Sequence, residues 1–332
     1  MKKIIFGILL SYLAFTACNN SENKDIPVLT SIEILDPAAL DLIDSAEKVQ
    51  ELSKGFSWAE GPVWVADLNA LLFSDVPENK IYKWSEKDSL TVFLSPSGFT
   101  DSANVNKGDG SNGLMLDAEG DLVICQHGDR RVASLKSGLQ NPSPEFITLA
   151  DNYNGKKFNS PNDLAIKSNG EIYFTDPPYG IKDEKIKELK FNGVYKVNQN
   201  GEVTLLTDSL SRPNGIAFSP DEKTIYINNS DLEKSYIYSY QLDTNGVFTY
   251  PQIFFNSSAY VKSGPGSHDG LKVHKSGNVF ATGPSGVFII SSQGKLLGII
   301  HTSKPTSNCA FDSEQKYLYM TTSDRLLRIK LK

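Results

Sequence analysis

Cysteine, basic charge and long apolar runs are all scarce in this sequence, and each shortage narrows what the protein can be. Only Cys125 and Cys309 follow the N-terminal segment, so we expect two buried thiols, with a single disulfide as the alternative. Acidic residues outnumber basic ones by 39 to 33, which gives a formal net charge of −6 and argues against a nucleic-acid partner. The one long apolar run lies at the N-terminus.

That N-terminal run predicts export. "MKKIIFGILLSYLAFTAC" has two lysines, an apolar run that is short for a full membrane span, and small residues before Cys18. It resembles a bacterial lipoprotein signal, so we predict a signal peptide over residues 1–17, lipidation of Cys18 and a polar tether over residues 18–29. The protein would then be periplasmic or on the cell surface of a bacterial envelope, with this lipid anchor as its only membrane contact. Plain secretion and a retained membrane anchor are the alternatives.

Short apolar runs separated by Gly, Pro, Asn and Asp indicate an all-β fold, and one unit recurs six times. Each unit has a polar residue, an apolar strand, a turn and a second apolar strand, as in "NDLAIKSNGEIYFT" at residues 162–175. Units spaced by about 50 residues predict a six-bladed β-propeller with four-stranded blades over residues 30–332. The last unit lacks an outer strand, which residues 48–54 would supply to close the ring. Residues 36–43 are expected to form a short helix or turn outside it.

Six polar residues begin the units, and we call them the marker residues: Glu60, Asn112, Asn162, Asn214, Asp269 and Asn308. In a propeller they would converge at one end of the central channel. Asn and Asp before a strand are also ordinary turn formers, but turn chemistry alone does not explain six polar residues in phase. Two carboxylates in a narrow channel are costly unless a positive charge neutralises them. Carboxylate and amide oxygens, without His or Cys, favour a hard ion such as Ca²⁺ or Mg²⁺.

The second strand of each unit returns to the same face of the ring. Asp75, His127 and Asp176 stand at such strand ends, and Tyr179 follows closely. A neutral His127 would orient a substrate hydroxyl or pass a proton, and a structural role in a rim loop is the alternative. His268 precedes Asp269, and we expect it to face away from the ion because neighbours on an extended chain point to opposite sides.

Several long motifs of this chain resemble the gluconolactonase, senescence-marker-protein and regucalcin-like (SGL) family. They are "WAEGPVW", "NSPNDLAIKSNGEIYFTDPPYG", "FNGVYKV", "RPNGIAFSPDEKTIY" and "DGLKVHKSGNVFATGPSGVFI", and they occur in the family's order from about residue 36 onward. The resemblance implies a six-bladed propeller with a divalent cation in its channel, and the hydrolysis of sugar lactones. Calcium is the usual ion, with Mg²⁺, Mn²⁺ and Zn²⁺ as alternatives.

The resemblance also assigns roles to particular residues. It implies that Glu60, Asn214 and Asp269 hold the cation, that Asn162 contacts metal or substrate, and that Asp269 is catalytic. Animal members carry an arginine where this chain has Ser160, so substrate anchoring must differ from theirs.

The function predicted from the sequence is the metal-assisted opening of a sugar lactone. The cation would polarise the lactone carbonyl, a water would attack, and Asp269, or a metal-bound water that it orients, would remove the proton. We predict that the sugar hydroxyls bind Asn162, Asn112, His127, Tyr179 and Asn308. The same site suits an esterase or phosphotriesterase. A non-catalytic, calcium-stabilised propeller that binds a sugar or a protein is the alternative from another class.

Overall fold

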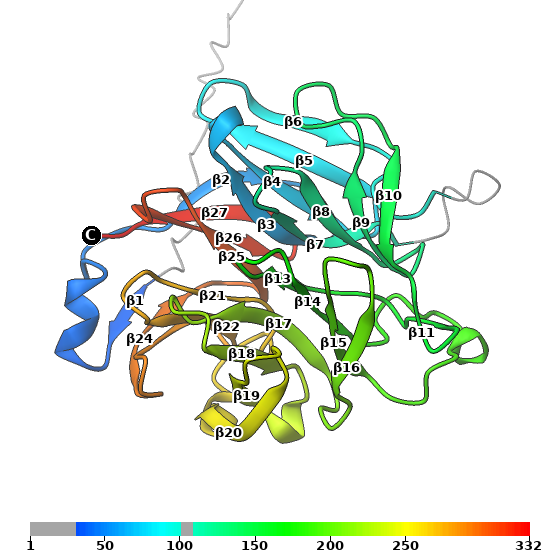
Figure 1. Cartoon of the computed structure of the whole chain (residues 1–332). Coiled ribbons are helices and arrows are strands. Elements are labelled where there is room, and N and C mark those ends of the chain that lie inside the picture. Colours follow the sequence, from blue (N-terminus) through cyan, green and yellow to red (C-terminus); the bar gives the residue numbers. More distant parts are fainter. Residues whose placement is uncertain (1–30, 101–108) are drawn as a thin grey trace, which may run out of the picture.

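The computed structural model describes residues 31–100 and 109–332 and contains six antiparallel sheets that surround a central channel (Figure 1). The first strands of the sheets lie in the middle of Figure 1 and contact one another in a closed circle. In order around that circle they are β3 (Ala59–Val65), β7 (Ser111–Leu116), β13 (Leu164–Ile166), β17 (Pro213–Phe218), β21 (Leu271–Val273) and β25 (Thr306–Phe311). The six-bladed β-propeller predicted from the repeat is confirmed.

Each blade runs outward from its first strand, and we number the blades 1 to 6 in that order. Blade 1 continues with β4 (Ala70–Asp75), β5 (Lys80–Ser85) and β6 (Ser89–Leu94), and blade 2 with β8 (Leu122–Gln126), β9 (Arg131–Leu135) and β10 (Phe146–Ala150). Blade 3 adds β14 (Ile172–Asp176), β15 (Gly193–Val197) and β16 (Val203–Thr207), and blade 4 adds β18 (Thr224–Asn229), β19 (Tyr236–Leu242) and β20 (Phe248–Asn256). Blade 5 adds β22 (Val279–Gly283), β23 (Gly286–Ile290) and β24 (Leu296–His301), and blade 6 adds β26 (Tyr317–Thr322) and β27 (Arg325–Lys330).

Blade 6 combines strands from the N-terminal and C-terminal parts of the described chain. Strand β2 (Gln50–Lys54) pairs with β27 and completes that blade, as expected for residues 48–54. Strand β1 (Ile32–Ile34) pairs with β24 as a fifth strand of blade 5, which the sequence did not predict, because three residues are too few to show an alternating pattern. Between them, the 3₁₀ helix η1 (Pro37–Asp41) gives the short helix expected over residues 36–43.

The remaining elements are short and lie in the connections. They are the 3₁₀ helices η2 (Ala66–Leu68), η3 (Glu184–Ile186), η4 (Leu232–Lys234) and η5 (Ser258–Tyr260), and a hairpin of β11 (Asn152–Tyr153) and β12 (Lys156–Lys157). None of the helices in the described ranges has the length and apolar character needed to cross a membrane. The predicted signal peptide, Cys18 and the tether lie outside the described residues, so these three predictions stay predictions.

The hydrophobic core forms six clusters, and each cluster fills the space between two neighbouring blades. Leu72 and Ile124, for example, belong to the cluster between blades 1 and 2. Cys125 and Cys309 are free thiols, fully buried in two of these clusters, as expected. Because the apolar side chains gather between the blades, the axis of the ring is left to polar groups.

Glycines after marker residues allow the first strands to crowd together around the axis. A Cβ atom on Gly61, whose φ is +51°, would lie 1.9 Å from the carbonyl oxygen of Asn112 in the next blade. A Cβ on Gly215 would lie 2.4 Å from the carbonyl oxygen of Asp269, and the Gly215 N–H donates a hydrogen bond to that oxygen at 2.9 Å. Only glycine permits these approaches, which bring the marker residues of adjacent blades close to one another.

Candidate functional site

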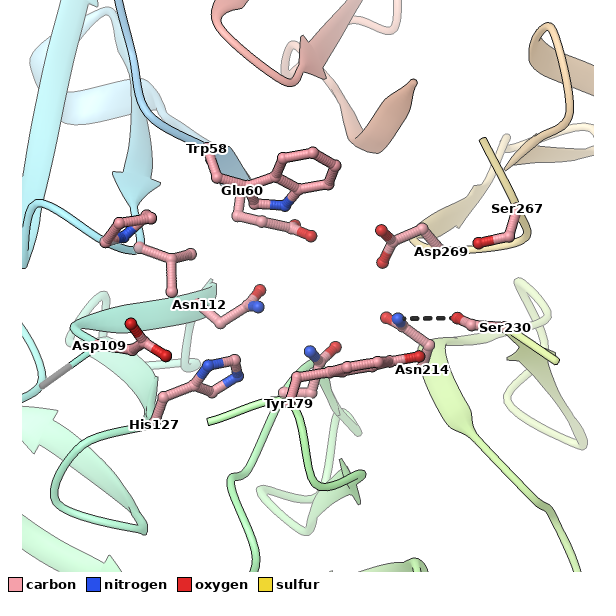
Figure 2. Close-up of a pocket in the computed structure, with 13 residues that line it drawn as sticks. Trp58, Glu60, Asp109, Asn112, His127, Tyr179, Asn214, Ser230, Ser267 and Asp269 are labelled. Carbon is pink, nitrogen blue, oxygen red and sulfur yellow. Dashed lines mark hydrogen bonds between the residues drawn. The ribbon is translucent and has the colours of Figure 1, made fainter. Parts of the chain in front are cut away.

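A cavity of about 320 Å³ lies at one end of the channel. It brings together Glu60, Asn112, His127, Asn162, Tyr179, Asn214 and Asp269. Figure 2 shows that Glu60 and Asp269 turn their carboxylates toward the same space from opposite sides. The cavity thus collects every predicted site residue of the described chain except Asn308.

Asn308 lies inside the channel but does not line this cavity. Its Oδ1 accepts a hydrogen bond from the Cys309 N–H at 2.9 Å, and its Nδ2 donates to Asp163 Oδ2 at 3.3 Å. Since both ends of the amide have partners, the position of Asn308 lends no support to the predicted contact with a sugar hydroxyl.

Three carboxylates share the channel. Glu60 and Asp163 are each 2% exposed, and Asp269 is partly open to solvent. Burial, with repulsion from Asp163, raises the pKa of Glu60 to about 7, although hydrogen bonds such as that from the Gly61 N–H oppose the rise. Withdrawal from water, then repulsion by Glu60 and Asp163, raises the pKa of Asp269 well above its usual value. Among the described residues, the only ion pair of these carboxylates joins Asp163 Oδ2 to Lys272 Nζ at 3.9 Å, so negative charge is in excess.

The side-chain amide of Asn214 is oriented by a chain of hydrogen bonds. The hydroxyl of Ser230 donates to the carbonyl oxygen of His268 at 2.5 Å, so it can only accept from Asn214. Asn214 Nδ2 accordingly donates to Ser230 Oγ at 2.9 Å, the bond dashed in Figure 2. This leaves Asn214 Oδ1 facing the cavity, buried and without a hydrogen-bond partner among the described residues.

Three further buried atoms at the site also lack partners within the described ranges: Asn112 Oδ1, Asp269 Oδ1 and His127 Nε2. Burial lowers the pKa of His127 to about 4, with Asp109 opposing the shift, so the imidazole is neutral at physiological pH. The residue is 3% exposed. A neutral ring with a bare nitrogen is suited to hydrogen bonding with a hydroxyl group.

The donor set at this site fits a hard cation. Asp269 Oδ1 and Asn214 Oδ1 are bare, and the Glu60 carboxylate points into the same cavity. Within residues 31–100 and 109–332, no three His, Cys, Asp or Glu side chains are grouped so as to hold a metal. A cation here would therefore need amide oxygens beside the two carboxylates, which is the oxygen-rich coordination that Ca²⁺ accepts.

Three of the six marker residues are also held through their main-chain carbonyl groups by the second strand of the preceding blade. Ser74 Oγ donates to the carbonyl of Asn112, Thr175 Oγ1 to that of Asn214, and Asn228 Nδ2 to that of Asp269, each at 2.8 Å. We call these donors the girdle. The girdle fixes the main chain of these three marker residues and does not occupy their side chains.

Of the strand-end residues, only His127 lines the cavity, together with Tyr179. The carboxylate of Asp75 accepts the backbone N–H groups of Ser57 and Trp58, each at 3.0 Å. Asp176 binds the backbone of its own blade in the same way. These two carboxylates thus hold the main chain of their own blades and do not line the cavity.

His268 is fully buried outside the cavity, as expected. Its Nδ1 lies 2.8 Å from the carbonyl oxygen of Thr282, and its Nε2 lies 2.7 Å from Ser257 Oγ. Burial lowers the pKa of His268 to about 4. The imidazole therefore supports the main chain around Asp269 without facing the site.

Sequence reasoning missed several residues at the site. The cavity is also lined by Trp58, Asp109, Ser230 and Ser267. A signal for Trp58 was available, since it stands two positions before Glu60 and alternation puts both on one face of the strand. Ser230 follows the end of β18, and only the folded structure shows that it reaches Asn214.

Comparison with known proteins agrees with this fold. Residues 58–324 match the family described as SMP-30/Gluconolactonase/LRE-like region. A gluconolactonase of Zymomonas mobilis is 36% identical over 328 residues, covering 96% of this chain and 90% of that protein. The structure of a gluconolactonase from Xanthomonas campestris matches with a TM-score of 0.79 and 29% identity, over 91% of this chain and 95% of that one. A calcium-binding regucalcin of Agrobacterium tumefaciens shares the fold, with a TM-score of 0.65 and 18% identity over 85% of this chain and 94% of that one.

Proposed function

The chain belongs to the SMP-30/gluconolactonase/LRE-like family, and on that premise we propose that it hydrolyses sugar lactones with a divalent cation in its channel. One observation carries the proposal. The carboxylates of Glu60 and Asp269 and the bare Oδ1 of Asn214 face one cavity, in a chain 36% identical to a gluconolactonase.

The proposed cation ligands are Glu60, Asn214 and Asp269, with Asn162 alongside. When bound, the ion would polarise the lactone carbonyl and stabilise the negative charge that grows on its oxygen. Ca²⁺ is the ion we propose, because the donors are carboxylate and amide oxygens only.

The protein side chains supply orientation and proton transfer. Asp269 is the proposed catalytic residue: its carboxylate, which lines the cavity, takes a proton from the attacking water and returns it to the ring oxygen as the lactone opens. Asn112, Asn162, His127 and Tyr179 are proposed to bind the sugar hydroxyls, and the neutral His127 would do so through its bare Nε2.

The test is a matrix of metals and substrates. Protein stripped with EDTA should lose the opening of D-glucono-1,5-lactone, measured by acid release, and Ca²⁺ should restore it. Aryl esters and phosphotriesters in the same assay separate a lactonase from the other hydrolases. Full activity after metal removal would contradict the proposed chemistry.

Two variants test the role of the Asp269 carboxylate. Asp269→Asn should lower kcat by about a hundredfold or more, because it removes the proposed base. Asp67→Asn, which alters an exposed carboxylate on η2, serves as the control and should leave kcat unchanged. Wild-type turnover by Asp269→Asn would exclude Asp269 as the catalytic residue.

A further inference from the structure

A second cavity, of about 520 Å³, adjoins the first beside blade 4. The two cavities share Tyr179, Ser230 and Ser267, so they form one continuous trough. The second part contains no marker residue. It is lined instead by charged side chains from the start of blade 4 and from η4, namely Arg212, Asp231 and Glu233.

Two of these charged groups are free to contact a ligand. Arg212 and Glu233 are exposed, and neither side chain forms an ion pair or hydrogen bond with the rest of the described chain. Asp231, by contrast, accepts hydrogen bonds from Ser211 Oγ at 2.6 Å and from the Glu233 N–H at 3.0 Å. The proposed opening of a lactone ring uses none of these groups.

The chemistry of the second cavity favours a neutral polyhydroxyl ligand. One guanidinium and two carboxylates line it, so a phosphate or carboxylate substituent would meet net negative charge. A guanidinium and a carboxylate can together bind neighbouring hydroxyl groups as donor and acceptor. Tyr179, 37% exposed where the cavities join, offers an aromatic ring with a polar tip, which suits the mixed surface of a sugar.

We propose that the second cavity binds the sugar that is attached to an aldonolactone, so that the substrates of this protein are disaccharide aldonolactones. This inference rests on the lactonase function proposed above. In a 1,4-linked disaccharide lactone the second sugar is attached to C4 of the lactone ring, which lies across the ring from the carbonyl carbon C1. With the carbonyl beside Glu60 and Asp269, the attached sugar would pass Tyr179 and reach Arg212 and Glu233.

The experiment compares cellobiono-1,5-lactone with D-glucono-1,5-lactone on the full chain with Ca²⁺. The wild-type protein should show a kcat/KM about tenfold or more higher for the disaccharide lactone, mainly through a lower KM, because charged side chains add hydrogen bonds to the second sugar. 6-Phospho-D-glucono-1,5-lactone should gain no such advantage.

Variants of residues that line the second cavity test whether it causes the preference for the disaccharide lactone. Arg212→Ala and Glu233→Gln should each reduce the ratio of the two kcat/KM values about tenfold. Lys234→Ala changes a charged residue of the same helix that does not line either cavity, and it should keep the wild-type ratio. Thermal unfolding of each variant verifies that it is folded, and using two variants guards against the failure of one.

The outcomes separate the two hypotheses. If neither lactone is opened, the lactonase function itself is wrong. If gluconolactone is opened and the disaccharide lactone is not preferred, or if the preference survives both Arg212→Ala and Glu233→Gln, the second cavity does not bind a sugar and the present inference is overturned. A preference for the phosphorylated lactone would overturn it as well and would assign Arg212 to an anion.

Discussion

At the scale of single residues, the site depends on side chains whose orientation is set by hydrogen bonds to neighbouring residues. Asn214 presents Oδ1 to the cavity because Ser230 accepts from its Nδ2, and Ser230 accepts because its own proton goes to His268. A supporting hydrogen bond of this kind tunes metal affinity without touching the metal. Ser230 is therefore a positioning residue for the proposed ion.

Ser230→Ala should weaken Ca²⁺ binding about tenfold, because the Asn214 amide is then free to turn its nitrogen toward the ion. Isothermal titration of the EDTA-treated protein measures the affinity directly, independently of activity. Ser230→Thr keeps the hydroxyl and should bind Ca²⁺ nearly as wild type does. Equal affinities in the alanine and threonine variants would show that the amide needs no such support.

The pH dependence of the reaction tests the state of His127. Burial lowers its pKa to about 4, so the ring stays neutral above pH 5 and its protonation should produce no inflection in kcat/KM between pH 5 and 8. His127→Gln should raise KM and leave the shape of the pH profile unchanged over that range. An inflection near pH 6.5 that disappears in His127→Gln would instead assign the ring to proton transfer.

Residue positions near the axis were predictable only in part. The marker residues occupy the same position in each repeat unit, and this recurrence alone predicted that Glu60, Asn214 and Asp269 lie close together. Asp163 was missed although it adjoins a marker residue, because strict alternation would send it away from the axis. The register shifts at the starts of several first strands, such as that between Glu60 and Val63, break this alternation. Side-chain hydrogen bonds between blades, such as that from Asn308 to Asp163, depend on packing that one sequence does not display.

At the scale of elements, the girdle links the second strands of blades 1, 3 and 4 to the marker residue of the next blade. Ser74, Thr175 and Asn228 perform this role, and Cys125 occupies the corresponding position of blade 2. The sequence shows these small residues at the ends of apolar strands. Their function became clear only when neighbouring blades were seen together.

Thr175→Val should destabilise the protein by about 1–2 kcal/mol, because the shape is kept while the buried carbonyl of Asn214 loses its donor. Urea denaturation measures the change in the free energy of unfolding. Thr204→Val on β16 of the same blade is the matched control, since the Thr204 hydroxyl has no partner in the described part of the chain. Equal stability of the two variants would mean that the girdle contributes nothing to folding.

At the scale of the whole molecule, the ring is closed by strands from both ends of the sequence. β2 covers the edge that β27 would otherwise expose, and the sequence predicted this closure because the last unit lacks a strand. The fifth strand of blade 5 was not predicted. The overall topology could thus be predicted from the repeat, whereas a strand of only three residues such as β1 could not.

A chain that begins at Ser31 should unfold at the same temperature as the full-length protein, since it retains β1, η1 and β2. A chain that begins at Gly55 loses all three and should aggregate or unfold at a lower temperature, because blade 6 then has an open edge. Thermal scans by circular dichroism compare the two. An unchanged melting temperature in the shorter chain would show that β2 is dispensable.

The predicted lipid anchor is tested on the full chain in a bacterial host. Cys18→Ala should move the protein from the membrane fraction to the soluble fraction, because the acceptor of the lipid is lost. Mass spectrometry of the mature N-terminus identifies the lipid in the unmodified protein. An unmodified Cys18 in protein recovered from the membrane would contradict the prediction.

The girdle has a consequence for how new enzymes arise from this architecture. It holds the main-chain carbonyl groups of Asn112, Asn214 and Asp269, while the apolar clusters fill the spaces between neighbouring blades. Exchanging the side chain of Asn112, Asn214 or Asp269 therefore leaves these main-chain hydrogen bonds in place. All three positions line one cavity, so substitutions there can change the chemistry of the site while the main-chain frame that carries it stays the same.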